Sequence, residues 1–121
     1  MLYLSNSNSA SIHAANQQAF IQSNLPEKES GNTWIGFRDY GKNGEFQWSD
    51  DSRRDFSNWA PGEPNNPIGG NQPCVEMYPD GHWNDDDCAK GQTFVCQFDR
   101  NVENLHCLVT FLILMKNLCS F

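Results

Sequence analysis

Apolar and small residues recur at helical spacing near the start of the chain. Ile12 and Ala15 begin a series that falls near one face of a helix. The segment 11–25 is therefore predicted to be helical, and the hydroxyl of Ser11 is suited to cap its N-terminus. Pro26 follows directly. Because proline cannot continue a helix, we expect the helix to end before it.

Short runs rich in β-branched and aromatic residues follow, and turn residues bound each of them. We expect the strands to lie at 33–37, 45–48 and 74–78, from 82–84 onward, and at 93–98. Asn43-Gly44 is a hairpin-type turn signal between the first two. One helix followed by short antiparallel strands indicates the α+β fold class.

The segment 60–73 differs from the rest of the chain in its backbone-breaking residues. It holds four prolines and three glycines, which leave little room for a helix or a strand. A loop of this length inside a compact domain is usually functional or disordered. We therefore expect residues that carry function in this loop or beside it.

Length and charge limit the classes of function. With 121 residues the chain has room for one domain. Its net charge of −7 argues against a nucleic-acid partner, which requires a basic face to meet phosphate. The same charge is compatible with cation binding, although a generally solvated acidic surface explains it equally well.

The five cysteines predict an oxidising compartment. Cys74, Cys88 and Cys96 lie in the polar, aromatic-rich body, which is typical of an extracellular or secreted disulfide framework. The odd number leaves at least one thiol without a partner within the chain. No C-x-x-C spacing or histidine cluster supports a zinc site.

The two ends do not fit the body. The first residues lack the basic start and apolar run of a signal peptide. The apolar run 105–115 is interrupted by Lys116 and is shorter than the roughly 20 residues that span a membrane, so a membrane role is not expected. We expect one domain at 1–100 and an apolar tail at 101–121 outside it, the product of a badly defined gene end.

Two polar clusters carry the candidate chemistry. Glu63-Pro64-Asn65 lies in the long loop, and Asn84-Asp85 follows about twenty residues later. Carboxylate and amide oxygens without histidine or thiolate partners suit a hard cation, Ca²⁺ before Zn²⁺. The sequence therefore favours binding over catalytic turnover.

These residues form part of a wider resemblance. The chain between about Ser11 and Phe98 is similar to the C-type lectin domain, through four motifs in the family's order. The motifs are Trp34-Ile35-Gly36-Phe37, the run 58–66 around Glu-Pro-Asn, Cys74-Val75-Glu76-Met77, and Trp83-Asn84-Asp85 with Cys88 and Cys96. The resemblance implies a C-type lectin-like fold: helices, two small antiparallel sheets and a long calcium-binding loop.

The resemblance also implies the disulfides. It pairs Cys74 with Cys88, and it pairs Cys96 with a cysteine near the first helix. This sequence has no cysteine before Cys74. We therefore expect the chain to lack the family's first strand, part of its first helix and its first cysteine, as an N-terminally truncated member would. Cys107 and Cys119 are the remaining candidates to bond Cys96.

The family's principal calcium site maps onto five residues. They are Glu63, Asn65, Gln72, Asn84 and Asp85. The resemblance further implies a cis peptide bond before Pro64, which turns its two neighbours toward one ion. Gln72 stands where the family usually has a glutamate, so one negative charge is missing. We therefore expect weak calcium binding, at or beyond about 10⁻⁴–10⁻³ M.

Sugar recognition follows from the same residues. Two vicinal hydroxyls of a saccharide would complete the Ca²⁺ shell, with Glu63, Asn65, Asn84 and Asp85 as hydrogen-bond partners. The Glu-Pro-Asn order resembles members that favour mannose, N-acetylglucosamine or fucose on glycans or glycoproteins. The glycan and the oligomeric state stay open.

Two other functions compete with glycan binding. A lectin-like domain that binds protein ligands without sugar activity is the first, because Gln72 and the missing segment weaken the calcium site. A glycoside hydrolase with Glu63 and Asp85 as acid and base is the second. Carboxylates committed to a cation are poor proton shuttles, so we do not expect an enzyme.

Overall fold

The structure is a computed structural model that describes residues 7–25, 31–66 and 68–98. Its elements run in the order β1 (Ser7–Ser9), α1 (Ala15–Asn24), β2 (Thr33–Arg38), β3 (Gln47–Trp48), β4 (Cys74–Met77), β5 (Trp83–Asp86), β6 (Thr93–Phe94) and β7 (Cys96–Phe98). This content confirms the α+β class. Within those ranges, α1 is too short and too polar to cross a membrane.

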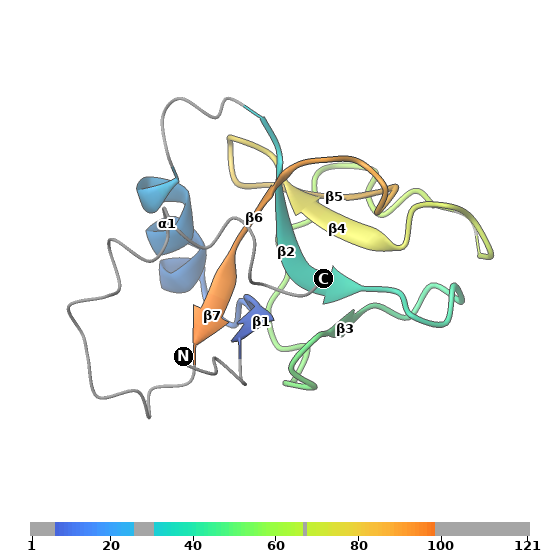
Figure 1. Cartoon of the computed structure of the whole chain (residues 1–121), viewed down its shortest axis with the longest axis horizontal. Helices are drawn as coiled ribbons and strands as arrows, with labels where there is room; N and C mark the ends of the chain where they lie inside the picture. The colour runs from blue at the N-terminus through green and yellow to red at the C-terminus, as the bar shows by residue number, and fades with distance from the viewer. Residues whose placement is uncertain (1–6, 26–30, 67, 99–121) are drawn as a thin grey trace, which may run out of the picture.

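The strands form two sheets, as expected. β1 pairs with β7 in one sheet, and the second sheet has the order β3-β2-β4-β5 with β6 beside β2. Figure 1 shows α1, β1 and β7 gathered at one end of the molecule and β3 to β5 at the other. β6 runs parallel to β2, through the pairs Thr33 with Thr93 and Trp34 with Phe94, so the sheets are not purely antiparallel.

The predicted strand 93–98 is divided between the two sheets. Val95 lies between β6 and β7, and its N–H donates to Trp34 O of the larger sheet at 3.0 Å. Its carbonyl accepts from Ala10 N at 2.7 Å, next to the smaller sheet. The alternation of this segment gave no sign of the change, because side-chain alternation does not show which strand the backbone pairs with.

The centre of the core lies against β2. Its first five residues are buried, which confirms the predicted buried strand. Phe37 stacks on Trp48 with ring centroids 4.3 Å apart, and Trp83 packs edge-on against both. Gly36 allows the chain after β1 to approach closely, because a Cβ there would lie 2.5 Å from Ser9 O.

The helix begins later than predicted. α1 starts at Ala15 instead of Ser11, and its N-cap, Ala14, makes no side-chain cap hydrogen bond. Ser11 instead donates its hydroxyl to Asp50 Oδ2 at 2.7 Å. The tertiary contact therefore takes the hydroxyl that we expected to cap the helix. The helix ends at Asn24, close to the predicted end.

A polar residue anchors α1 to the core. Gln18 is the buried residue of the helix. Its Nε2 donates to Gly81 O at 2.8 Å and its Oε1 accepts from Trp83 Nε1 at 2.9 Å. Ile21 packs more loosely, and Phe20 is exposed. The apolar face predicted for this helix is therefore not its main attachment.

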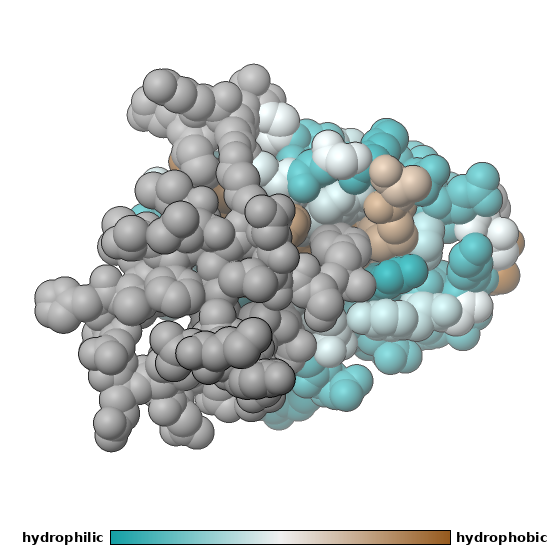
Figure 2. All heavy atoms as spheres, viewed as in Figure 1, coloured by the Kyte–Doolittle hydropathy of each residue, from teal (hydrophilic) through white to brown (hydrophobic). Residues whose placement is uncertain are grey.

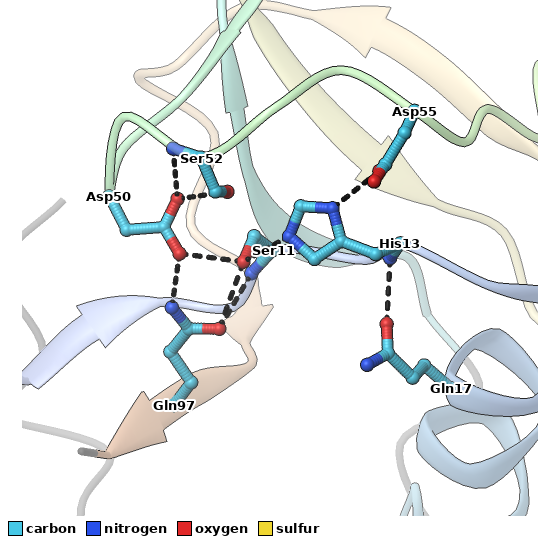
Figure 3. A network of polar contacts seen from close by, with 7 residues as sticks. All are labelled: Ser11, His13, Gln17, Asp50, Ser52, Asp55 and Gln97. Atoms are coloured by element: carbon cyan, nitrogen blue, oxygen red, sulfur yellow. Dashed lines mark hydrogen bonds and ion pairs between the residues drawn. The ribbon is translucent and has the colours of Figure 1, made fainter.

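A second polar network joins three separate segments (Figure 3). Ser11 and His13 precede α1, Asp50 and Asp55 follow β3, and Gln97 lies on β7. The carboxylate of Asp50 accepts from Ser11, Ser52 and Gln97. Burial alone would raise the pKa of Asp50, but these hydrogen bonds outweigh burial and lower the pKa to about 2. The network therefore fastens the smaller sheet to the loop after β3.

One disulfide bond agrees with the pairing that the family resemblance implied. Cys74 is bonded to Cys88, with Cα atoms 5.3 Å apart, as expected. Cys96 is also disulfide-bonded. The expected tail, 101–121, together with Cys107 and Cys119, lies outside the described residues.

The described surface is mainly polar. On the face that Figure 2 shows, hydrophilic residues surround small hydrophobic areas. Phe20, Tyr40 and Ile68 are the large hydrophobic side chains that the described ranges leave exposed. A ligand of this surface would therefore meet mostly hydrogen-bonding groups.

Candidate functional site

The long loop is fastened to β5 where it begins. Trp83 N donates to Asn58 O at 2.8 Å, and Ala60 N donates to Trp83 O at 2.9 Å. A turn follows, in which Glu63 N donates to Ala60 O at 3.0 Å. These bonds bring the Glu63 segment beside the strand that carries Asp85. The two clusters that are twenty residues apart in the sequence thus meet in space.

The peptide bond between Glu63 and Pro64 is cis, as the resemblance implied. After this bend, the N–H groups of Asn65 and Asn66 donate to the two carboxylate oxygens of Asp85, at 3.0 and 2.9 Å. The Asn65 side chain donates from Nδ2 to Glu63 Oε1 at 2.9 Å. Glu63, Asn65 and Asp85 are therefore brought together as predicted.

The two carboxylates, Glu63 and Asp85, lie close to each other, and among the described residues neither forms an ion pair with Lys, Arg or His. Asp85 is fully buried, and Glu63 is half-buried. Burial raises the pKa of Glu63, and the neighbouring Asp85 carboxylate raises it further. Within the described ranges the second oxygen of Glu63, Oε2, is buried and has no hydrogen-bond partner. Such an arrangement favours a bound cation.

Asn84 is beside this pair in the chain, and its side chain makes a different contact. It lies opposite Glu76 in the β4–β5 ladder. Its Nδ2 donates to Glu76 Oε1 at 3.0 Å. The resemblance placed Asn84 among the ligands, and the structure leaves its Oδ1 without a donor among the described residues.

Gln72 lies with another acidic residue. Its side chain lies near Asp86 and helps to lower the pKa of that carboxyl, and Asp86 accepts a hydrogen bond from Lys90 Nζ. Burial would raise the pKa of Asp86, but Lys90 and the other donors lower it. The structure therefore places Gln72 with Asp86, and none of its described contacts reaches Glu63 or Asp85.

The donor set fits a hard cation better than zinc. In the ranges 7–25, 31–66 and 68–98, no three His, Cys, Asp or Glu side chains gather closely enough to hold a metal ion. A cation bound here would thus draw on amide oxygens besides the two carboxylates. The buried oxygen of Glu63 without a partner is the observation that fits such an ion.

One important residue escaped the sequence analysis. Glu76 is 1% exposed and lies in the middle of β4. It accepts hydrogen bonds from the amides of Asn32, Asn84 and Gln92. A charged residue inside an otherwise apolar strand was the available signal, because such residues are rarely buried without partners.

A hollow of about 250 Å³ lies away from these residues. Its lining residues belong to β3 and to the loop after it, and include Trp48, Arg53 and Arg54. None of the five predicted ligands lines it. The candidate site is therefore a polar surface built by the long loop and β5, and it lies outside that hollow.

Known proteins support the family suggested by the motifs. The family model for the lectin C-type domain matches residues 4–98. The low affinity immunoglobulin epsilon Fc receptor of Mus musculus is 46% identical over 88 residues, which are 72% of this chain and 25% of that protein. Asialoglycoprotein receptor 2 of Homo sapiens is 38% identical over 104 residues, which are 81% of this chain and 32% of that protein.

A solved structure agrees with the sequence relatives. It is the cow C-type carbohydrate-recognition domain of CD23 in the presence of a GlcNAc2Man3 oligosaccharide, with a TM-score of 0.62 and 35% identity. The match covers 77% of this chain and 70% of that one. The chain spans about a quarter to a third of the two receptors' length. With the two sheets, the Cys74–Cys88 bond and the family match in agreement, the chain belongs to the C-type lectin domain family.

Proposed function

We propose that this domain binds carbohydrate in a calcium-dependent manner and favours mannose-type sugars. The main support for this proposal is the Glu63–Asp85 pair. These two carboxylates are neighbours, and the buried Oε2 of Glu63 has no hydrogen-bond partner among the described residues. A bound cation would relieve their repulsion and satisfy that oxygen. The family match supplies the expectation that the cation is Ca²⁺.

The chain's own oxygens would hold the ion. Glu63 and Asp85 offer carboxylates, and Asn65 and Asn84 offer amide oxygens, with Gln72 as the fifth proposed ligand. A bound Ca²⁺ supplies open coordination positions that sugar hydroxyls can fill. The N–H groups of Asn65 and Asn66 already fix the Asp85 carboxylate, so the protein side of the site is preorganised.

Sugar selectivity would come from the order of hydrogen-bonding groups around the ion. Carboxylates accept from sugar hydroxyls and amide groups donate to them, so the Glu63-Pro64-Asn65 order fixes which hydroxyl geometry fits. This order supports equatorial vicinal hydroxyls, as in mannose, N-acetylglucosamine and fucose. The cow relative, solved in the presence of GlcNAc2Man3, supports the same ligand class.

We expect single-site affinity to be low. Two carboxylates only neutralise the charge of Ca²⁺, and Gln72, which lies near Asp86, adds no charge. Binding at about 10⁻⁴–10⁻³ M suits an extracellular module. The disulfide Cys74–Cys88 supports an extracellular or secreted location. Strong attachment to cell-surface or secreted glycoproteins would then require several copies.

The test is capture on mannan-coated beads. We expect the wild-type chain to bind in CaCl₂ and to be released by chelator and by free mannose, whereas free galactose releases much less. E63A and D85A should bind less than a tenth as well, and E45Q, which changes an exposed acidic residue elsewhere, should bind like wild type. Capture that persists in chelator would contradict the proposal.

A protein ligand is the second candidate function. The mouse relative is by its name a receptor for the immunoglobulin epsilon Fc portion. If the domain binds protein without sugar, capture of a glycoprotein ligand should survive enzymatic removal of its glycans and the E63A change. Loss of capture after deglycosylation favours the first proposal.

A further inference from the structure

Glu76 is the buried acidic residue whose contacts call for an explanation beyond packing. It is 1% exposed, and the three groups that donate to it are neutral amides. Burying a carboxylate without a cationic partner costs free energy even when its oxygens are hydrogen-bonded. An apolar residue at this position of β4 would extend the surrounding core at a lower free-energy cost of burial. The carboxylate therefore has a role other than filling space.

Of the three amides that donate to Glu76, that of Asn84 belongs to the proposed ligand set. Glu76 and Asn84 are directly opposite in the antiparallel β4–β5 ladder, so their side chains share one face of the sheet. A carboxylate accepts and does not donate, so the atom of Asn84 that faces Glu76 has to be the amide nitrogen. The observed contact, Nδ2 to Glu76 Oε1 at 3.0 Å, meets this condition.

The orientation has a direct consequence for the proposed cation site. An asparagine amide can present either its oxygen or its nitrogen, and a nitrogen directed at a cation would repel it. With Nδ2 committed to Glu76, Oδ1 is the atom left to coordinate, and no described residue donates to it. Asn84 also adjoins Asp85, which holds the long loop.

The surroundings of Glu76 make this orientation rigid. Asn32, just before β2, shares Oε1 with Asn84, and Gln92, just before β6, donates to Oε2 at 2.7 Å. Both Glu76 oxygens are thus fixed from segments outside β4 and β5. Burial raises the pKa of the Tyr78 hydroxyl, and Glu63 and Glu76 raise it further, so both carboxylates act on one neighbouring group.

We propose that Glu76 is a positioning residue of the cation site: it fixes the amide of Asn84 so that Oδ1 faces the ion. This inference rests on the proposed calcium-dependent function. Glu76 itself touches neither ion nor sugar. The same contact leaves Asn84 one amide hydrogen for a sugar hydroxyl, so sugar capture is expected to depend on Glu76 as well.

Three variants separate orientation from general stability. E76M keeps the length of the side chain and removes the acceptor, so the Asn84 amide can rotate. E76Q keeps one acceptor oxygen for that amide. In E76M/N84D, the aspartate presents an oxygen in either rotation and needs no positioning. The matched control is Q92A, which removes the donor to the other oxygen of Glu76.

The measurement is calcium affinity by titration calorimetry on the oxidised chain, after thermal unfolding in calcium-free buffer has shown each variant to be folded. We expect E76M to weaken calcium binding about tenfold or more, and E76Q and Q92A to stay within about threefold of wild type. E76M/N84D should recover most of the loss. If E76M does not fold, E76S, which is too short to reach Asn84 and admits water, takes its place.

The possible results test the role of Glu76 separately from the proposed calcium-dependent sugar binding. If wild type binds calcium and E76M binds it with an affinity within twofold of wild type, the proposed role of Glu76 is wrong, whereas the proposed function stands. A weakened E76M that N84D does not rescue also overturns it, because the loss would then be structural. Absence of calcium binding by the folded wild type overturns the proposed function itself.

Discussion

Replacing Glu63 by glutamine should have opposite effects with and without calcium. The substitution removes one of two adjacent carboxylates and keeps the shape of the side chain. Without calcium, the repulsion that helps to raise the pKa of Glu63 disappears. We therefore expect E63Q to be slightly more stable than wild type, by under about 1 kcal/mol for this half-buried group.

With calcium the order should reverse. A ligand that binds the folded state stabilises it by RT ln(1 + [L]/Kd). At about 10 mM CaCl₂ and a Kd of about 1 mM, wild type gains about 1.4 kcal/mol. For a domain of this size, that gain raises the melting temperature by about 6–11 °C. E63Q should gain less than about 2 °C, because the ion loses a charged ligand.

The assay is thermal unfolding followed by circular dichroism, in chelator and in CaCl₂. E45Q is the matched control, because Glu45 is an exposed acidic residue paired with Arg54 and lies outside the site. It should shift with calcium as wild type does. An E63Q variant that gains as much as wild type would refute the reasoning, as would a wild type that gains nothing.

Three further changes test other parts of the structure. Q18A leaves the buried indole N–H of Trp83 without its partner and removes one of the two side-chain donors to the Gly81 carbonyl, the other being Asn58, so chemical denaturation should show a loss of about 1–3 kcal/mol. The folded pKa of Asp50, about 2, is below its ordinary value of 3.8, so its contribution is present above pH 3.8 and is lost as pH falls toward 2. Solvent screening limits that contribution to about 1 kcal/mol, and D50N should flatten the acid dependence of unfolding accordingly. Q72E adds a carboxylate to the proposed ligand set, so calorimetry should show calcium binding about fivefold tighter, and no gain would place residue 72 outside the site.

Local pattern and motif spacing sufficed for the parts of the fold that depend on near neighbours. The buried strand β2 and the irregular long loop were predicted in this way, whereas the pairing of Cys74 with Cys88 was implied by the family resemblance. The convergence of Glu63 and Asp85 was also predicted, because the family resemblance assigns both residues to one calcium site. These features are set by short stretches or by motif order.

The predictions that failed concern contacts between distant segments. Ser11 was expected to cap a helix, but Asp50, 39 residues away, takes its hydroxyl. The alternation around Val95 gave no sign that two sheets share the segment. The amides that converge on Glu76 come from three segments whose approach is fixed only by the folded sheet. The periodicity of hydrophobic residues in a short segment carries no information on contacts between distant segments.

Calorimetric titration of the oxidised chain with CaCl₂ decides between the claim that the Glu63–Asp85 pair holds Ca²⁺ and its opposite. We expect one saturable site of about 10⁻⁴–10⁻³ M that disappears in a folded E63A/D85A variant. A folded wild type that gives no saturable heat, or a double variant that binds calcium equally well, would contradict the claim.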